Sequence, residues 1–286
     1  MTAQLIDGKA IARQERKALR PRIEALAKRN IVPGLAVCMV GENAASAVYV
    51  RNKVRACQEI GMRSWVHTFA EGVQENEVIE RIEELNKASD VHGIIVQLPL
   101  PQRFDLRKVI ETINVTKDVD GFHLYNVGGL MIGDMVFPPC TPYGVQVLLE
   151  RSGVRVEGQN VVVVGASNIV GKPMAMLLLQ KDATVSICHV KTRDLAQYTI
   201  LADVLVVAAG RPNLIRPEMV RRGAVVIDVG INRLSDGRLV GDVDFEGVKE
   251  RAAYITPVPG GVGPMTVTML LTNTVRAAER GTGSTC

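Results

Sequence analysis

The chain has 286 residues, of which 47% are hydrophobic and 22% are charged, so it is long enough for one or two globular domains with a substantial core. Its formal net charge is only +4 and its basic residues are dispersed. This pattern argues against a nucleic-acid partner, although a mildly positive protein suits a small anionic ligand.

The first part of the chain alternates between helical and strand patterns. We expect a long helix after Asp7, which can cap it, and we expect Pro21 to kink that helix. Strands are expected at residues 35–41, 65–69 and 93–101, and helices at 44–61, 75–87 and 105–113. Such alternation predicts a mainly parallel sheet with helices on both faces.

Residues 114–144 interrupt the alternation, because they are rich in Gly, Pro and Asp, and we interpret them as a boundary between two lobes. After this boundary, strands are expected at 160–165, 184–189, 203–210 and 224–230, with helices at 169–180 and 266–280. A second glycine–proline loop, at 257–265, precedes the last helix. The sequence therefore predicts a two-lobed α/β protein.

The segment VVVVGASNIVG (161–171) has the order strand, tight turn, helix. Gly165 ends the strand, and Gly171 permits close packing of helix against strand. The start of the helix is expected to offer free N–H groups and a positive dipole end, which favour a phosphate. The spacing is not that of a full GxGxxG motif, so a simple packing turn stays open, but the βαβ context favours dinucleotide binding.

The following strand ends near His189, about 20 residues on, where a cofactor with a free ribose hydroxyl usually meets Asp or Glu. This chain has HVKTR there instead. The cations Lys191 and Arg193 favour a phosphorylated ribose, and hence NADP over NAD. The alternative is that both cations are solvated at a helix start.

Tyr49 and Lys53 lie four residues apart on a predicted helix and share one face. That face is expected about 100° from the buried stripe, so the pair should point toward a rim or cleft. The stripe is predicted at Ala47, Val50, Val54 and Cys57. Taken alone, a Tyr/Lys pair four residues apart on a helix is more often a solvent-exposed pair without a function. YxxxK also occurs in short-chain dehydrogenases, but there the pair follows the glycine loop, whereas here it precedes it.

The segment GIIVQLPLP (93–101) reads as a buried strand that carries Gln97 at its end. An amide at such a position is unfavourable unless it is hydrogen-bonded. Gln97 either caps a backbone group or has a partner elsewhere in the chain.

The cysteines, the histidines and the N-terminal segment indicate which features we do not expect: disulfides, a metal site and a signal peptide. Five cysteines without a CxxC motif suggest reduced thiols in a cytoplasmic protein. The four histidines are far apart, so no metal site is expected. The start MTAQLIDGKA does not suggest a signal peptide, and no apolar run approaches the roughly 18 residues of a membrane span.

Seven segments together are similar to one family, the bifunctional methylenetetrahydrofolate dehydrogenase/methenyltetrahydrofolate cyclohydrolases. They occur in the family's order, from about residue 5 to about residue 280. The segments are VGENAASAVYVRNK, GIIVQLPLP, KDVDGF, PCTPYG, VVVGASNIVGKPMA, VIDVGIN and ITPVPGGVGPMT.

The resemblance implies two reactions in one cleft between the lobes. NADP accepts a hydride from methylenetetrahydrofolate, and water then opens the resulting methenyltetrahydrofolate to formyltetrahydrofolate. It also implies an N-terminal catalytic domain (1–139), onto which the last helix (266–286) packs, and a Rossmann-type NADP-binding domain (140–265). A homodimer joined through the nucleotide-binding lobe is expected.

The resemblance also assigns roles to residues. Lys53 matches the catalytic lysine, Tyr49 the tyrosine, Gln97 the strand-end glutamine and Asp120 the pterin-binding aspartate. These four also bind substrate, together with Leu98, Pro259, Gly260, Gly261 and Val262. The residues implied to bind the cofactor are Thr141, Gly165, Ala166, Ser167, Ile169, Val190, Lys191, Thr192 and Ile231.

Two positions depart from the family pattern. Many members have arginine where this chain has Ala166, and serine or arginine where it has Val190. Lys191, Thr192 or Arg193 is expected to replace these phosphate contacts. Ala166 and Val190 therefore weigh against the expected preference for NADP over NAD.

Two other interpretations stay open. One is a monofunctional NAD(P)-dependent dehydrogenase of similar architecture, and the other is a nucleotide-binding regulatory protein with a degenerate catalytic lobe. The presence of Lys53, Gln97 and Asp120 argues against both.

Overall fold

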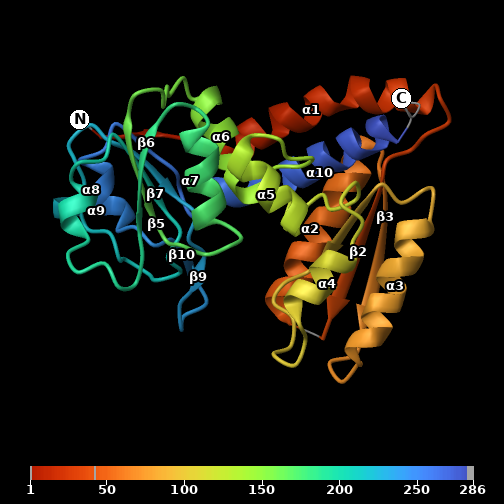
Figure 1. Cartoon of the computed structure of the whole chain (residues 1–286). Helices are drawn as coiled ribbons and strands as arrows, with labels where there is room; N and C mark the ends of the chain where they lie inside the picture. Colours follow the sequence, from red (N-terminus) through yellow and green to blue (C-terminus); the bar gives the residue numbers. More distant parts are fainter. Residues whose placement is uncertain (1, 42, 282–286) are drawn as a thin grey trace. The chain divides into compact units, whose positions relative to one another are not determined.

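The computed structural model describes residues 2–41 and 43–281, which divide into two compact units (Figure 1). The six-stranded unit contains the described residues up to Arg13 together with Thr141–Thr266. The three-stranded unit contains Gln14–Cys140 and the residues from Val267 onward. Cys286 and the end of the predicted segment 266–286 lie outside the described residues.

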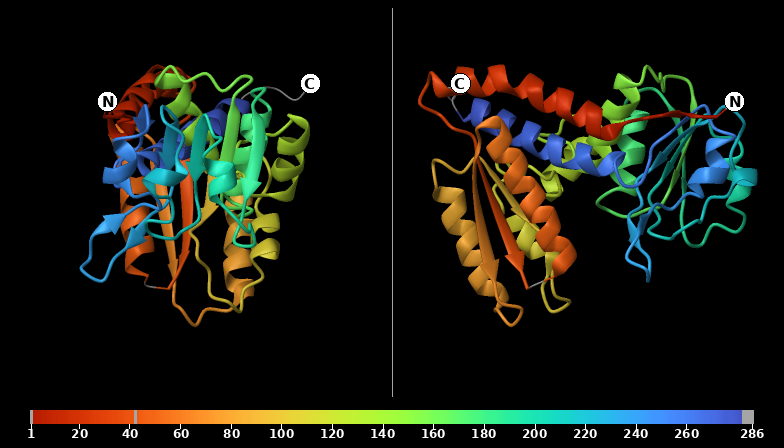
Figure 2. Two further views of the ribbon diagram at one scale, coloured as in Figure 1. Left: turned by 90° about the vertical axis from the view of Figure 1, so that its left-hand side faces the viewer. Right: turned by 180° about the vertical axis from the view of Figure 1, so that it is seen from behind.

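The three-stranded unit is built on a parallel sheet in the order β3-β2-β4, with strands β2 (Gly34–Val40), β3 (Arg63–Phe69) and β4 (Gly93–Val96). Helices α2 (Ala44–Ile60) and α3 (Glu75–Lys87) lie on opposite faces of this sheet (Figure 2). The core on the α3 face joins alternate residues of β2, such as Ala36 and Cys38, to Ile82. The smaller helices of this unit are α4 (Leu106–Thr112) and α5 (Leu124–Ile132).

Two long helices, α1 (Gly8–Ala27) and α10 (Val262–Arg280), contribute residues to both units. Within the three-stranded unit they lie side by side, and Arg22 of α1 donates two hydrogen bonds to the Glu279 carboxylate of α10, at 2.8 and 2.7 Å. Asp7 caps α1, since its Oδ1 accepts a hydrogen bond from the backbone N–H of Ala10 at 3.0 Å. The helix continues through Pro21, where a kink was predicted.

The six-stranded unit has an all-parallel sheet in the order β1-β11-β8-β7-β5-β6. Its strands are β1 (Gln4–Leu5), β5 (Asn160–Val164), β6 (Thr184–Cys188), β7 (Val204–Val207), β8 (Val225–Asp228) and β11 (Tyr254–Ile255). Its helices are α6 (Cys140–Arg151), α7 (Gly171–Leu179), α8 (Ala196–Thr199), the 3-10 helix η1 (Pro217–Met219) and α9 (Phe245–Lys249). A separate antiparallel hairpin joins β9 (Asn232–Arg233) to β10 (Leu239–Val240).

The predicted α/β fold with parallel sheets is confirmed, and the start of the chain is the main difference. Sequence reasoning assigned residues 1–139 to one domain, but β1 pairs with β11 in the six-stranded sheet. Ala3 and Ile6 are buried there, and the Ala3 N–H donates to the Lys249 carbonyl at 2.7 Å. A two-residue strand is too short to show a period, so the pattern gave no sign of it.

The predicted boundary segment, residues 114–144, also contains structure that the sequence did not predict. It contains α5, which includes Gly128 and Gly129, and α6 begins near its end. Among the described residues, none of the helices has both the length and the apolar run that a membrane span requires.

Candidate functional site

Lys53 of α2 is a buried lysine with a defined partner. Its side chain is only 8% exposed, and its Nζ donates a hydrogen bond to Gln97 Oε1 at 3.0 Å. Gln97 directly follows β4, and its own amide Nε2 donates to the Leu98 carbonyl at 2.8 Å. Since the amide nitrogen is engaged there, the amide oxygen is turned toward the amine. Both alternatives left open by the sequence are therefore realised, because Gln97 binds a backbone carbonyl through its nitrogen and the Lys53 amine through its oxygen.

Helix α2 holds Lys53 rigidly, because both helix ends are capped. Asn43 Oδ1 accepts a hydrogen bond from the Ser46 N–H at 3.0 Å, and Gly61 ends the helix in the left-handed conformation with φ 83°. The stripe of buried residues differs from the predicted one, because Lys53 lies within it and not about 100° away. The residues of this helix that the structure describes as buried are Ser46, Val50, Lys53, Ala56, Cys57 and Ile60. Hydrophobic periodicity cannot place a buried cation on an apolar face, because the pattern counts lysine as polar.

Tyr49 lies half-buried one turn before Lys53 on the same helix. Burial raises the pKa of the Tyr49 phenol above its ordinary value, so the hydroxyl keeps its proton at neutral pH and can donate a hydrogen bond.

Asp120 is an electrostatic neighbour of Lys53. Burial raises the pKa of the Asp120 carboxyl, and the positive charge of Lys53 opposes this rise. The Cys140 thiol lies next to the same carboxyl. Lys53, Gln97 and Asp120 therefore form one polar cluster inside the three-stranded unit.

The neighbouring Asp118 has a structural role that sequence reasoning missed. Its Oδ2 accepts hydrogen bonds from the His123 N–H at 2.8 Å and from Asn126 Nδ2 at 2.7 Å. Asn273 of α10 braces the same loop by donating to the Val119 carbonyl at 2.9 Å. In the sequence, Asn273 is a polar residue on an otherwise apolar face of the last helix, and this is the signal that could have revealed its contact.

The turn after β5 brings backbones very close together at two glycines. Gly165 has φ 122°, and a Cβ there would lie 2.1 Å from the Ala208 carbonyl oxygen. A Cβ on Gly171 would lie 2.0 Å from the Gly165 carbonyl oxygen. Both positions require glycine, and Gly171 permits the close strand–helix packing that the sequence predicted, although it is the first residue of α7 and not an interior one.

The N–H groups at the start of α7 are already engaged, contrary to the expectation of free donors. Ser167 Oγ accepts hydrogen bonds from the Val170 N–H at 3.1 Å and the Gly171 N–H at 3.3 Å. The Lys172 N–H donates to the Ser167 carbonyl at 3.0 Å. The serine that fills the middle of the glycine motif therefore serves as the local cap. Ala166 is half-buried in this turn and Ile169 is exposed.

The loop after β6 carries the predicted phosphate contacts on its surface. The His189 N–H donates to Thr192 Oγ1 at 2.9 Å, and the Lys191 N–H donates to His189 Nδ1 at 3.1 Å. Val190 is 95% exposed, and Lys191 and Arg193 are also exposed. The turn is stabilised by its own side chains, and the exposed cations Lys191 and Arg193 are accessible to a ligand from solvent.

Six further predicted residues lie in the six-stranded unit. Thr141 Oγ1 lies 3.0 Å from Thr266 Oγ1, and Ile231, after β8, is 45% exposed. In the loop that leads into α10, Pro259 is exposed while Gly260, Gly261 and Val262 are buried. These last residues belong to a different unit from Lys53, Gln97 and Asp120.

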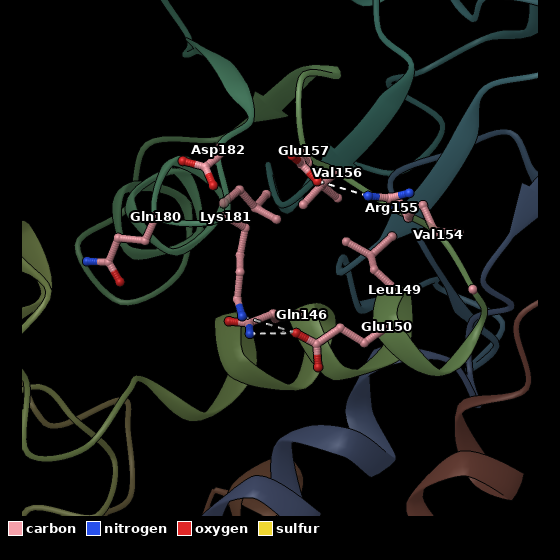
Figure 3. A pocket seen from close by; sticks show the side chains of 12 residues that line it. Gln146, Leu149, Glu150, Val154, Arg155, Val156, Glu157, Gln180, Lys181 and Asp182 are labelled. Atoms are coloured by element: carbon pink, nitrogen blue, oxygen red, sulfur yellow. Dashed lines mark hydrogen bonds and ion pairs between the residues drawn. The ribbon is translucent and has the colours of Figure 1, made fainter.

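A hollow between α6 and the end of α7 contains none of the predicted site residues (Figure 3). Lys181 Nζ reaches Glu150 Oε1 at 3.6 Å across it, and Gln146 Nε2 donates to the same oxygen at 2.8 Å. Since Lys181 is paired with Glu150 and Arg155 with Glu157, we do not take this hollow as a candidate catalytic site. Among residues 2–41 and 43–281, no group of three or more His, Cys, Asp or Glu side chains could hold a metal ion.

Comparison with known proteins identifies the family of this chain. The catalytic-domain model of tetrahydrofolate dehydrogenase/cyclohydrolase matches residues 6–120, and the NAD(P)-binding-domain model of the same family matches residues 139–282. The bifunctional protein FolD of Nitrosospira multiformis is 61% identical over 280 residues, which are 98% of this chain and 97% of the relative.

Solved structures give the same answer. The FolD methylenetetrahydrofolate dehydrogenase/cyclohydrolase of Campylobacter jejuni is 50% identical, with a TM-score of 0.95 over 97% of this chain and 99% of its own. The Trypanosoma brucei enzyme, complexed with NADP cofactor and inhibitor, is 40% identical, with a TM-score of 0.96 over 99% of this chain and 100% of its own. The chain belongs to the tetrahydrofolate dehydrogenase/cyclohydrolase family.

Proposed function

We propose that this protein is a bifunctional one-carbon folate enzyme. It oxidises methylenetetrahydrofolate to methenyltetrahydrofolate with NADP and then hydrolyses the product to formyltetrahydrofolate. The observation that carries the proposal is the buried Lys53 amine, hydrogen-bonded to a neutral amide at 3.0 Å and near the Asp120 carboxyl. FolD relatives that are bifunctional by name, over nearly the whole chain, support it.

The dehydrogenase step needs little acid–base catalysis from the protein. The carbon that bridges two nitrogens of the substrate loses a hydride, and the resulting cation is stabilised by conjugation with those nitrogens. The chain must therefore mainly hold substrate and NADP in alignment, while the nicotinamide supplies the hydride acceptor. The close backbone approach at Gly165, with Thr141 and the exposed Ile231, fits a nucleotide at the carboxyl edge of the sheet.

The cyclohydrolase step needs proton transfer. Water must lose a proton as it attacks the methenyl carbon, and the leaving ring nitrogen must gain one. Lys53 can do both, because an amine accepts a proton in its neutral form and donates one in its charged form. Gln97 positions the amine without adding charge. A carboxylate in its place would pair with the ammonium and hold it protonated.

Asp120 and Tyr49 bind the substrate in this proposal. The Asp120 carboxylate can accept hydrogen bonds from the amino group and ring N–H of the pterin. Tyr49 supplies a ring for packing and a hydroxyl for water or Lys53. Leu98 and the loop of Pro259–Val262 are proposed to complete the folate contacts, with the glycines allowing close approach of backbone to substrate.

Lys191, Thr192 and Arg193 are proposed to contact the ribose phosphate of NADP in place of the absent arginine at Ala166. The exposed cations of this self-supported turn support the assignment. Replacing Lys191 and Arg193 together by alanine should raise KM for NADP roughly 10- to 100-fold, the range expected for lost charged hydrogen bonds, and leave KM for NAD unchanged. Equal effects on both cofactors would contradict the assignment.

The direct test of the proposed function uses the purified full chain. Methenyltetrahydrofolate is added and the absorbance of its conjugated cation is followed, and oxidation of methylenetetrahydrofolate is assayed in parallel with NADP and with NAD. Decay clearly faster than in buffer, together with NADP-dependent oxidation, is the expected result. Oxidation without accelerated decay would instead establish the monofunctional dehydrogenase.

A homodimer joined through the six-stranded unit and a cytoplasmic location belong to the same proposal. Strand β6 is an edge strand of the sheet, and exposed apolar side chains near it, Ile187, Tyr198 and Leu201, support association there. The four buried thiols suit a reducing compartment. Light scattering should give twice the 31.0 kDa chain mass, and a monomer mass would refute the dimer.

A further inference from the structure

Two buried aspartates in the six-stranded unit have no role in the chemistry described so far. Asp228 is the last residue of β8, and Asp242 lies two residues after β10. Their exposures are 3% and 0%. Carboxylates buried to this degree must be held by strong hydrogen bonds, so their partners show what they do.

Asp242 joins the end of β7 to the β9–β10 hairpin. Its Oδ2 accepts hydrogen bonds from the N–H groups of Ala209 at 2.7 Å and Gly210 at 2.8 Å. Its Oδ1 accepts a hydrogen bond from Asn232 Nδ2, in β9, at 2.8 Å. One side chain therefore fixes two loops.

Asp228 fixes the loop after its own strand. Its Oδ1 accepts from the N–H groups of Gly230 and Asp242, both at 3.0 Å, and its Oδ2 accepts from the Val243 N–H at 2.9 Å. Its backbone N–H donates to Thr256 Oγ1 at 2.8 Å. Asp228 thus holds the backbone that carries Asp242, and both carboxylates act as one unit.

Each carboxylate also lies against a glycine next to the other. A Cβ on Gly230 would lie 2.3 Å from Asp242 Oδ1, and a Cβ on Gly241 would lie 1.8 Å from Asp228 Oδ2. No side chain fits at either glycine without displacing a carboxylate. The arrangement therefore leaves the two loops a single close-packed conformation.

The two loops held in this way lie at the carboxyl ends of β7 and β8. Ile231 stands between Gly230, bonded to Asp228, and Asn232, bonded to Asp242. Residue Ala208, just before the two N–H groups bound by Asp242, has its carbonyl oxygen directly against Gly165. In open parallel sheets the carboxyl edge is where nucleotides bind.

We propose that Asp242 and Asp228 are positioning residues of the cofactor site, which hold Ile231 and the Ala208–Gly210 loop in the conformation that accepts the nicotinamide nucleotide. This inference rests on the proposed function and adds to it. Both carboxylates act through backbone N–H groups and an amide, without touching the reacting atoms. Their loss should weaken binding of the cofactor and leave hydrolysis, which uses Lys53 and no nicotinamide, unaffected.

The test compares Asp242→Asn with the wild-type full chain, after the wild type has been shown to carry both activities. An amide in place of the carboxylate turns an N–H₂ group toward one of the existing donors. KM for NADP is expected to rise roughly 10- to 100-fold, the range for lost hydrogen bonds to a charged group, with KM for methylenetetrahydrofolate and the hydrolysis rate within about two-fold of wild type. Absence of both activities in the wild type would refute the proposed function itself.

A matched control is Asp203→Asn in the same unit. Asp203 is half-buried, and therefore more exposed than Asp242, but it also accepts a backbone hydrogen bond, from the Asn160 N–H at 2.9 Å, and it lies at the amino ends of β5 and β7. It should leave KM for NADP unchanged. An unchanged KM for NADP in Asp242→Asn, or an equal loss of hydrolysis and oxidation, would overturn the proposal.

A second variant decides the matter if Asp242→Asn fails to fold. Asn232→Ala keeps both carboxylates and removes the amide that donates to Asp242 Oδ1 at 2.8 Å and to the Gly241 carbonyl at 3.2 Å. KM for NADP should rise about two- to ten-fold with hydrolysis intact, as expected for the loss of one or two hydrogen bonds. An unchanged KM for NADP in a folded Asn232→Ala protein would overturn the proposal on its own.

Discussion

Each unit of this protein carries a pair of aspartates, and one of these four residues, Asp120, has partners of a different kind from those of the other three. In the three-stranded unit, Asp120 lies near the Lys53 ammonium and the Cys140 thiol, while Asp118 is bound by a backbone N–H and an asparagine. In the six-stranded unit, Asp228 and Asp242 receive hydrogen bonds from backbone N–H groups and one asparagine.

The difference separates chemistry from positioning. A carboxylate beside an amine shares an environment in which protons can move, because both groups can change charge. A carboxylate bound by backbone N–H groups has partners that cannot titrate, and it therefore serves to fix loops. By this criterion we propose that Asp120 and Lys53 take part in the reaction and that the other three aspartates fix the framework.

The largest expected effect is that of Lys53→Met, which keeps the length of the side chain and removes the amine. Hydrolysis of methenyltetrahydrofolate should fall by about 100- to 10,000-fold, the usual contribution of a positioned acid–base group. The exposed cation Arg51, on the same helix, provides the control variant Arg51→Met, which should hydrolyse at the wild-type rate. A Lys53→Met protein with wild-type hydrolysis would remove the amine from the mechanism.

The comparison within KDVDGF is sharpened by changing each aspartate to asparagine. Asp120→Asn should raise KM for the folate substrate roughly 10- to 100-fold through lost charged hydrogen bonds, with little change in stability. Asp118→Asn should instead lower the free energy of unfolding by about 1–3 kcal/mol, since its partners His123 N–H and Asn126 stay buried. Steady-state kinetics and urea unfolding of both variants measure the two effects. A loss of stability in Asp120→Asn together with a raised KM in Asp118→Asn would contradict the assignment of substrate binding to Asp120 and of stabilisation to Asp118.

A smaller effect is expected from Gln97→Glu, which makes the neutral partner of Lys53 a carboxylate. The added charge favours the ammonium form, so the rising limb of the hydrolysis rate should move to higher pH by about one unit or more. Gln97→Met removes the hydrogen bond without adding charge and should lower the rate without this displacement. Superimposable pH profiles for Gln97→Glu and wild type would contradict the role given to the amide.

The smallest effect concerns pH and stability in the six-stranded unit. Burial raises the pKa of Asp228 from its ordinary 3.8 to about 7, with the neighbouring Asp242 charge acting in the same direction. In this window the folded state holds a proton that the unfolded chain has lost. The contribution of Asp228 to stability is therefore complete below about pH 4 and is lost as the pH rises through about 7.

The free energy of unfolding of wild type relative to Asp228→Asn should accordingly fall by about 1 kcal/mol per pH unit across this window. Urea unfolding of both proteins at a series of pH values measures the difference. A difference that stays constant with pH would show that Asp228 keeps an ordinary carboxylate in the folded protein.

Much of the fold could be predicted because most of its strands and helices are long enough to show a period. Helix α3 occupies the predicted residues 75–87, and β5 and β6 each end one residue before the predicted end. The two-residue strands β1 and β11 could not be found, because so short a run has no period. Their pairing places the start of the chain in the six-stranded unit.

The candidate site shows the same division. Lys53 and Gln97 are 44 residues apart, and their hydrogen bond could be expected only because the segments around them resemble a known family. The Asp228–Asp242 pair was not predicted, because each residue alone resembles an ordinary turn aspartate. Its role becomes visible only when the sheet brings five loop N–H groups and two glycines against the two carboxylates.

The central claim, that the buried Lys53 amine moves the protons of ring opening, is tested most directly by chemical rescue. A Lys53→Ala variant leaves space for a small primary amine, and its hydrolysis of methenyltetrahydrofolate is followed with ethylamine or with tetramethylammonium added. We predict a rate that rises in proportion to the concentration of neutral ethylamine and does not respond to tetramethylammonium, which has no proton to give. Hydrolysis at the wild-type rate by Lys53→Ala without any added amine would contradict the account.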